Sequence, residues 1–122
     1  MKENIRILIV EDEALVARCL GMELEMVGFE VCKFASSGEE AIALARENDP
    51  HLILIDINLV GDINGIEATR QIHKHKVIPV IFMSGYSQLE IYDEVKGINP
   101  ICYFNKPVEI EVLKSVIDEY FA

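Results

Sequence analysis

Polar residues whose types suit phosphoryl chemistry lie at the ends of short, strongly apolar segments. Glu11 and Asp12 follow the first segment, Asp56 lies near the end of the third, Ser84 ends the fourth and Lys106 follows the fifth. An ionised aspartate can act as a nucleophile, while a cation and a lysine ammonium stabilise charge on the phosphoryl oxygens. Brought together, these residues would form a site that accepts a phosphoryl group.

The cation that such a site would hold is a hard one. Three carboxylates packed together repel one another, and a divalent cation relieves that repulsion. Because the candidate ligands are all oxygens, Mg²⁺ or Mn²⁺ fits best; Ca²⁺ fits less well, since no loop rich in Asp and Asn supplies a cage. His51, His73 and His75 lack metal-ligand spacing, so we interpret them as solvated or satisfied side chains.

Each acid also has an ordinary structural interpretation. Asp12 alone would be a helix N-cap, and Glu11 alone a solvated acid. Asp56 is harder to explain this way, because an acid inside an apolar run costs several kcal/mol of desolvation unless something compensates it. Its structural alternative is a buried ion pair.

The elements that must position these residues alternate along the chain. Short β-branched apolar runs predict strands at 5–10, 31–35, 52–57, 80–84 and 101–104. Three of these runs are almost wholly apolar, which is typical of parallel strands covered on both faces. The segments between and after them have features of helices.

Five helices are predicted from apolar stripes and capping residues. The first carries the stripe Val16, Leu20, Leu24 and Val27, and ends at Gly28. Capping pairs then start three helices, at Ser37 with Glu40, Asn64 with Glu67, and Ser87 with Glu90. The last helix covers about 108–120, with the stripe Leu113, Val116, Ile117 and Tyr120.

This alternation predicts an α/β fold, a single doubly wound (βα)5 domain over residues 1–122. The five parallel strands would carry helices on both faces, in the flavodoxin-like order 2-1-3-4-5 or in a half-Rossmann order. In the first order, strands one, three and four are neighbours, so the polar residues converge at the carboxyl edge. Because the first strand is followed by acids and no Gly-x-Gly-x-x-Gly, dinucleotide binding is excluded.

Composition narrows the class of protein further. With 122 residues, 51% of them hydrophobic, the chain has the material for one folded domain. A net charge of −10 disfavours direct binding to nucleic acid or to anionic membranes, and no apolar run is long enough to span a bilayer. The odd set Cys19, Cys32 and Cys102 predicts small buried hydrophobes in a reducing compartment, so we expect a cytoplasmic protein.

Taken in order, the motifs resemble those of the receiver domains of two-component response regulators. The resemblance covers essentially the whole chain and rests on four separated motifs: Glu11-Asp12, Asp56-Ile57-Asn58, Ser84-Gly85 and Tyr103-Phe104-Asn105-Lys106-Pro107. Each motif alone is weak, whereas the set in this order is specific. With this resemblance we predict the strand order 2-1-3-4-5.

The resemblance also implies a role for each site residue. Asp56 would be the aspartate phosphorylated by a histidine kinase or phosphotransfer protein, with Mg²⁺ held by Glu11, Asp12, Asp56 and the Asn58 carbonyl. Ser84 and Lys106 would contact the phosphoryl oxygens, and Tyr103 would be the switch aromatic, altering the surface of helix four, strand five and helix five. Asn58 and Tyr86 would flank the path of attacking water, and the Lys106–Pro107 peptide would be cis.

One segment departs from the family pattern. Relatives commonly carry Met-Pro after the phosphoacceptor turn and a Gly eight residues beyond the aspartate, whereas this chain has Leu59-Val60 and places Gly65 nine residues beyond Asp56. We interpret this as a one-residue insertion that alters the loop over the site.

Two other functions use similar residues. A small Mg²⁺-dependent phosphatase of the haloacid dehalogenase type would need a second acid two residues after the nucleophile, where this chain has Asn58. A receiver-like scaffold acting only by protein contacts is disfavoured because all five expected polar positions are filled. The sequence leaves open the kinase, the downstream partner, a homodimer through the switch surface, and whether the domain stands alone or belongs to a longer regulator.

Overall fold

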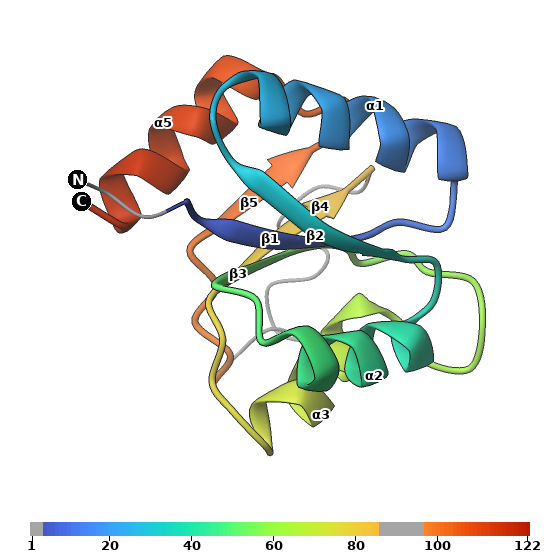
Figure 1. The fold of residues 1–122 in the computed structure, drawn as a ribbon. Coiled ribbons are helices and arrows are strands. Elements are labelled where there is room, and N and C mark those ends of the chain that lie inside the picture. Colours follow the sequence, from blue (N-terminus) through green and yellow to red (C-terminus); the bar gives the residue numbers. More distant parts are fainter. Residues whose placement is uncertain (1–3, 86–96) are drawn as a thin grey trace.

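A computed structural model describes residues 4–85 and 97–122 of the chain as a three-layer α/β domain (Figure 1). The strands are β1 (Arg6–Val10), β2 (Glu30–Ala35), β3 (Leu52–Asp56), β4 (Val80–Ser84) and β5 (Cys102–Asn105). The helices are α1 (Ala14–Met26), α2 (Gly38–Asn48), α3 (Gly65–His73) and α5 (Ile110–Tyr120). The helix predicted to start at Ser87 lies outside the described residues.

All five strands are parallel and follow the order β2-β1-β3-β4-β5. The prediction of the flavodoxin-like order is therefore confirmed, and the half-Rossmann order is excluded. The helices α1 and α5 cover one face of the sheet, and α2 and α3 cover the other (Figure 1). This arrangement brings the carboxyl ends of β1, β3 and β4 together, as the chemistry requires.

The core consists of two apolar clusters, one on each face of the sheet. Every residue of β3 and β4 is buried, which explains why their sequences are almost continuously apolar. Successive residues of β3 point to opposite faces of the sheet. Leu52 and Leu54 pack on the side of α1 and α5, and Ile53 and Ile55 pack on the side of α2 and α3. The two central strands thus give the site a rigid base.

The predicted caps begin two of the helices. The hydroxyl of Ser37 accepts the Glu40 amide at 3.1 Å, and Asn64 Oδ1 accepts the Glu67 amide at 2.9 Å. The reciprocal contact of the first cap is shifted by one residue, because the Glu40 carboxylate accepts the Ser36 amide at 2.6 Å. Both capped helices lie on the same side of the sheet, under the loops that lead to the site.

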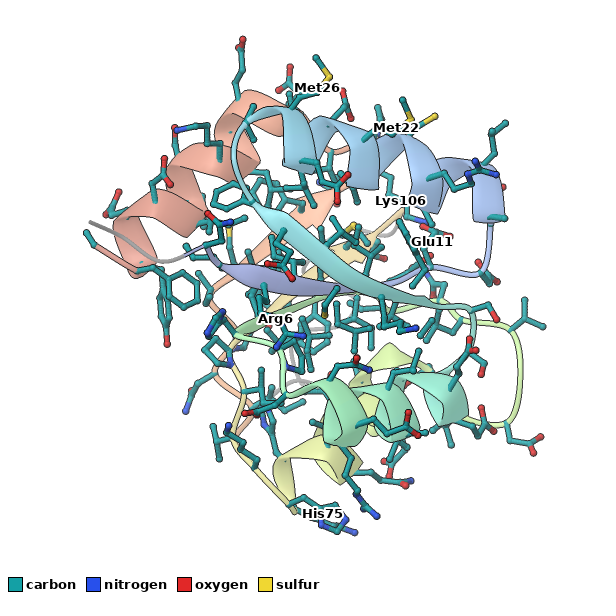
Figure 2. All side chains as sticks on the ribbon, in the orientation of Figure 1. Arg6, Glu11, Met22, Met26, His75 and Lys106 are labelled. Atoms are coloured by element: carbon teal, nitrogen blue, oxygen red, sulfur yellow. The ribbon has the colours of Figure 1, made fainter. Side chains whose placement is uncertain are left out.

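Helix α1 differs from the prediction on its outer side. Cys19 is exposed, so its interpretation as a small buried hydrophobe is wrong; Cys32 and Cys102 are partly buried. Val16, placed in the core stripe from its spacing, is also exposed, because the buried line of α1 is Ala17, Leu20, Gly21 and Leu24. Met22 and Met26 project away from the sheet (Figure 2).

Helix α5 begins two residues later than predicted, and Tyr120 in its expected stripe is 52% exposed. Within residues 4–85 and 97–122, no helix is long and apolar enough to cross a membrane.

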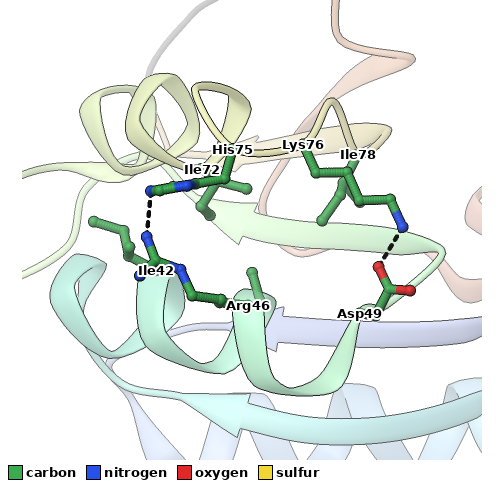
Figure 3. A pocket seen from close by; sticks show the side chains of 8 residues that line it. Ile42, Arg46, Asp49, Ile72, His75, Lys76 and Ile78 are labelled. Atoms are coloured by element: carbon green, nitrogen blue, oxygen red, sulfur yellow. Dashed lines mark hydrogen bonds and ion pairs between the residues drawn. The ribbon is translucent and has the colours of Figure 1, made fainter.

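At the amino end of the sheet, one ion pair and one arginine–histidine contact rim a small cavity between α2 and α3 (Figure 3). Lys76 pairs with Asp49, and Arg46 contacts His75 Nε2, above a floor that includes Ile42 and Ile72. The other two histidines also have partners: His51 Nδ1 accepts the Arg6 amide, and His73 Nε2 contacts the Ile78 carbonyl. The interpretation of all three histidines as satisfied side chains agrees with these contacts.

Candidate functional site

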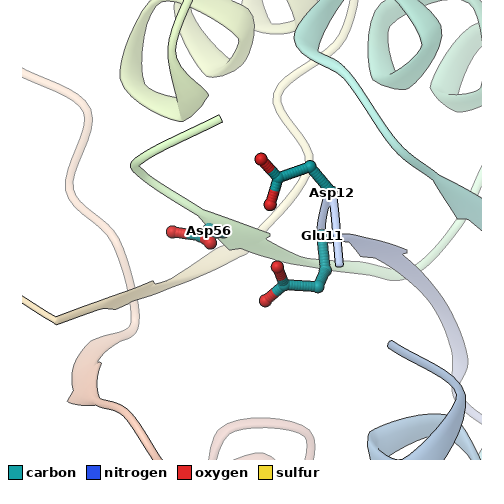
Figure 4. Close-up of side chains that lie close together, drawn as sticks. All are labelled: Glu11, Asp12 and Asp56. Carbon is teal, nitrogen blue, oxygen red and sulfur yellow. The ribbon is translucent and has the colours of Figure 1, made fainter. Parts of the chain in front are cut away.

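Three acids from two neighbouring strands meet at the carboxyl edge of the sheet. Glu11 and Asp12 directly follow β1, and Asp56 is the last residue of β3 (Figure 4). One carboxylate oxygen from each residue lies within 4.8 Å of the other two. Glu11 and Asp56 are buried, at 2% and 3% exposure, while Asp12 is partly exposed at the mouth. The prediction that these acids converge is correct.

Lys106 joins two of these carboxylates across the sheet. Its ammonium donates to Glu11 Oε1 and to Asp56 Oδ2, both at 2.6 Å. Its backbone amide donates to the Ser84 carbonyl, which extends the β4–β5 ladder and fixes where the side chain starts. The Lys106–Pro107 peptide is cis, as predicted. The compensating ion pair expected for a buried Asp56 is therefore present.

Burial and hydrogen bonding shift the pKa values of Glu11 and Lys106. Desolvation raises the pKa of Glu11, and the hydrogen bonds from Lys106 and from the Glu13 amide oppose that rise only in part. Burial by itself would lower the pKa of Lys106, but its hydrogen bonds to Asp56 and Glu11 outweigh burial and raise it. Lys106 therefore stays protonated and holds its positive charge between the two acids.

Asp12 does not cap helix α1. The N-cap position is Glu13, which makes no side-chain capping bond, whereas Asp12 Oδ2 accepts the Val60 amide at 3.3 Å. The ordinary structural interpretation of Asp12 is thus wrong, and its carboxylate faces the site. The contact with Val60 was not predicted from the sequence.

Asn58 and Ser84 form the opposite wall of the site. The Asn58 amide donates to Asp56 Oδ1 at 2.9 Å, so both oxygens of the Asp56 carboxylate are held. The Asn58 side chain donates from Nδ2 to Ser84 Oγ at 3.2 Å, and Ser84 is buried at the end of β4. The hydroxyl and the candidate acceptor are therefore parts of one hydrogen-bonded group.

Tyr103 lies on β5 beside this group and is partly buried. Its ring stacks on Phe82 of β4, with centroids 6.0 Å apart and an interplanar angle of 27°. The ring is therefore a half-buried aromatic on β5, the strand that neighbours Ser84 of β4. Tyr86 lies outside the described residues.

Gly65 is a positioning residue whose structural reason the sequence did not reveal. It opens α3 directly behind the site, and its amide donates to the Ile57 carbonyl at 2.9 Å. A Cβ at this position would lie 2.3 Å from the Asp56 carbonyl oxygen. A glycine is therefore required where the start of α3 passes closest to Asp56.

The donor set fits a hard divalent cation. Three carboxylates face one ammonium, which leaves two formal negative charges at the mouth of the site. All candidate ligands are oxygens, the donor type that Mg²⁺ prefers. In the part of the chain that the structure describes, this is the one cluster of three or more acids, histidines or cysteines with metal-binding spacing.

Comparison with known proteins agrees with the fold and the site. Residues 7–118 match the family model of the response regulator receiver domain. The chain is 36% identical to Protein PilH of Pseudomonas aeruginosa, covering 96% of this chain and 98% of that protein. It is 30% identical to the transcriptional regulatory protein PdtaR of Mycobacterium tuberculosis, covering 93% of this chain and 55% of that one.

Solved structures give the same result. A CheY-like receiver domain protein from Methanospirillum hungatei has a TM-score of 0.85 and 30% identity, over 97% of this chain and 94% of that one. The receiver domain of a modulated diguanylate cyclase from Desulfovibrio desulfuricans has a TM-score of 0.88 and 32% identity, over 96% and 93%.

A parallel 2-1-3-4-5 sheet with buried acids and a lysine at its carboxyl edge defines a flavodoxin-like domain of the kind used in signalling. This chain belongs to the response regulator receiver domain family of two-component systems. It spans about half the length of several of the curated relatives it matches, including PdtaR.

Proposed function

We propose that this protein is a phosphoacceptor whose Asp56 takes a phosphoryl group from a histidine kinase or phosphotransfer protein. The observation that carries the proposal is the buried Asp56 carboxylate, held by the Lys106 ammonium and by the Asn58 amide. A purely structural ion pair would need one acid and one base. Here two further acids share the same space, which a cation and a phosphoryl group would explain.

The transfer forms one bond and breaks one. An Asp56 carboxylate oxygen attacks the phosphorus atom of a phosphohistidine, the phosphorus–nitrogen bond breaks, and the imidazole leaves and takes up a proton. Lys106 lies 2.6 Å from Asp56 Oδ2, where its charge can stabilise the phosphoryl oxygens as they develop charge. The Ser84 hydroxyl would donate to a second phosphoryl oxygen.

Asp12, Asp56 and the Asn58 carbonyl would hold Mg²⁺ or Mn²⁺, with Glu11 acting through water. When bound, the cation neutralises the acids and the equatorial phosphoryl oxygens. Without it, a phosphoryl donor meets three carboxylates. We therefore expect phosphorylation to stop in excess EDTA.

The protein switches a partner rather than turning over a substrate. Ser84, drawn toward the phosphoryl group, would vacate space beside β4 for the Tyr103 ring on the neighbouring strand, changing the surface of helix four, β5 and α5. A partner or homodimer would bind there only after phosphorylation. Beryllofluoride, as a phosphoryl mimic, should shift amide signals on this surface in the wild type and not in Ser84→Ala.

Residues beside the acceptor would set the lifetime of the phosphoprotein. Asn58 stands where a dehalogenase-type phosphatase carries its general acid, so hydrolysis would be slow. Tyr86 would shield the path of attacking water, and the half-life should shorten in Tyr86→Ala.

Intact-protein mass spectrometry tests the acceptor directly. After incubation with acetyl phosphate and Mg²⁺, the wild type should gain one phosphoryl group that is labile to base, and Asp56→Asn should gain none. Label that persists in Asp56→Asn, or that appears on a histidine, would show that the acceptor is another residue. Steady release of phosphate without accumulation of the adduct would favour the phosphatase.

A further inference from the structure

A small cavity lies between α2 and the segment that follows α3, at the amino end of the sheet and away from the phosphoacceptor site (Figure 3). Its volume is about 120 Å³. The lining has an apolar floor of Ile42, Ala45, Ile72 and Ile78 and a polar rim of Arg46, Asp49, His75 and Lys76. The floor is buried or partly buried, whereas the rim is exposed. The cavity is therefore apolar inside and charged at its mouth.

The guanidinium of Arg46 meets a histidine at this mouth and not an acid. Arg6 and Arg70 each lie beside a glutamate, and the chain carries 21 acids to 11 lysines and arginines. Among residues 4–85 and 97–122, however, no carboxylate pairs with Arg46, which contacts His75 Nε2. Because an arginine can only donate, His75 Nε2 is the acceptor and is uncharged. Arg46 therefore has a positive charge that no acid of the described chain neutralises.

A carboxylate would bind Arg46 more strongly than the His75 imidazole does. The planar guanidinium can donate two parallel N–H bonds to a carboxylate, and the attraction of opposite charges adds to those bonds. The imidazole offers one uncharged nitrogen in the same place. An organic anion that reached the mouth would therefore displace His75 from Arg46, and its apolar body would lie on the floor of the cavity.

The local charge favours an anion although the protein as a whole is acidic. Between Glu67 and Glu90 the sequence contains no acid, and the residues there that can carry positive charge are Arg70, His73, Lys74, His75 and Lys76. Among the described residues that line the cavity, Asp49 is the one acid, and Lys76 pairs with it. A cleft lined mainly by one sign of charge raises the local concentration of ions of the opposite sign.

The volume of the cavity and the contacts at its mouth limit what can enter. An apolar cavity of about 150 Å³ engineered in another protein takes up benzene, so the cavity here suits a body of about one six-membered ring. The Arg46–His75 contact bounds one end, and the Lys76–Asp49 pair bounds the other (Figure 3). Because both ends are bounded, the occupant ends inside the cavity. This favours a free small molecule over a length of peptide.

We propose that this cavity binds a small organic anion, with its carboxylate at Arg46 and an apolar body of about one ring on the isoleucine floor. The site lies beyond the carboxyl end of α3, whereas Gly65 at the amino end of α3 packs behind Asp56. Binding therefore needs neither Mg²⁺ nor a phosphoryl group, and its failure would leave the proposed phosphoacceptor function untouched. For a ligand of this size we expect a dissociation constant on the order of 1 mM.

Titration of the wild-type protein with benzoate, followed by amide NMR, tests the site. Benzoate should shift the signals of Ala45, Arg46, His75 and Ile78, and the shifts should saturate. Benzyl alcohol has the ring without the charge, and acetate has the charge without the ring. Each should bind at least about tenfold more weakly than benzoate. Shifts centred on the acidic site, shifts that do not saturate, or equal affinity for benzoate and benzyl alcohol would overturn the proposal.

A charge variant tests the role of Arg46. Arg46→Gln should weaken benzoate binding about tenfold and leave the binding of benzyl alcohol unchanged. Arg18→Gln is the matched control, because Arg18 is exposed on α1, on the other face of the sheet (Figure 1). Equal weakening by the two variants would show that the anion is not bound at Arg46 and would overturn the proposal.

Filling the cavity tests where the apolar body lies. Ala45→Leu should weaken the binding of both benzoate and benzyl alcohol, because the larger side chain occupies the floor. If Ala45→Leu does not fold, Ile42→Phe makes the same test at a partly buried position of the floor. Unchanged benzoate binding in a folded filled variant would overturn the proposal. Tighter binding of a glutamate-rich peptide than of benzoate at these residues would also overturn it, because the occupant would then be a protein segment.

Discussion

Two lysines in this protein contact carboxylates at the same distance but in different surroundings. Lys106 lies 2.6 Å from Asp56 and from Glu11, whose side chains are almost fully buried, while its own is 25% exposed. Lys114 lies 2.6 Å from Asp118 on the outside of α5, where both side chains are more than 40% exposed. Distance alone would rank the two contacts as equal.

The contacts differ in whether water can solvate the charged groups once the contact is broken. At α5, water solvates both groups when the pair opens, so the contact contributes little to stability. At the site, removing the ammonium leaves two buried acids without their compensating charge. The energy of an ion pair therefore depends on its burial and on its partners.

We expect the largest effect from a change in the packing around Asp56, which pairs with Lys106. Gly65→Ala places a Cβ 2.3 Å from the Asp56 carbonyl oxygen, so the backbone must shift. We expect a loss of about 3 kcal/mol in the free energy of unfolding, measured with urea. Gly85→Ala is the control, because a Cβ there meets nothing within 4 Å. Equal stability of the two variants would show that the site is loosely packed.

The second-largest effect should be the difference in stability between variants of the two lysines. Lys106→Met should lower the free energy of unfolding by about 2 kcal/mol, below the cost of breaking a fully buried pair because Lys106 is partly exposed. Lys114→Met should change it by less than about 0.5 kcal/mol. Losses of similar size in the two variants would mean that burial does not distinguish the contacts.

Mg²⁺ should act on one of the two regions only. Without the competing ammonium, the acids of Lys106→Met should bind the ion more tightly, so millimolar Mg²⁺ should stabilise this variant by about 1 kcal/mol more than wild type. Lys114→Met should respond as wild type does. Thermal unfolding with Mg²⁺ and with EDTA measures the difference, and an equal response in all three proteins would contradict it.

The smallest effect concerns the exposed pair at the amino end of the sheet. The hydrogen bond and charge of Lys76 lower the pKa of Asp49 from its ordinary value of 3.8. The stabilisation of the folded state by this pair is therefore complete above pH 3.8, and it is lost as the pH falls through the lowered pKa of Asp49 in the folded state. Lys76→Met should return the Asp49 titration, followed by carboxyl NMR, toward 3.8. An unchanged titration would mean that the pair does not form in solution.

The sequence predicted the buried region better than the exposed one. The apolar runs of β3 and β4 are nearly continuous because both faces are covered, so strand type and the convergence of Asp56 and Ser84 followed directly. The contact of Asp12 with Val60 depends on the path of the β3–α3 loop. That path is set by tertiary packing, such as Ile63 lying where a Cβ on Gly38 would be, which no local pattern encodes.

Helix α1 shows why periodicity alone was insufficient on the surface. The sequence carries apolar residues on both sides of this helix, and a stripe of spacing four and three fits either side. The prediction chose a line through Val16 and left Cys19 buried. Only the position of the sheet decides which line is covered, and it covers Ala17 and Leu24.

The position of Lys106 in the chain has a consequence for synthesis. Its ammonium is contributed 95 residues after Glu11 and 50 after Asp56, directly behind β5, which is an edge strand and the last of the sheet. Glu11 and Asp56 leave the ribosome before Lys106, so the nascent chain carries these carboxylates before their counter-charge exists. Until β5 packs against the sheet, the acids at its carboxyl edge have no ammonium beside them, and the site is incomplete. The last strand of the sheet to be made therefore completes the charge balance of the acidic site.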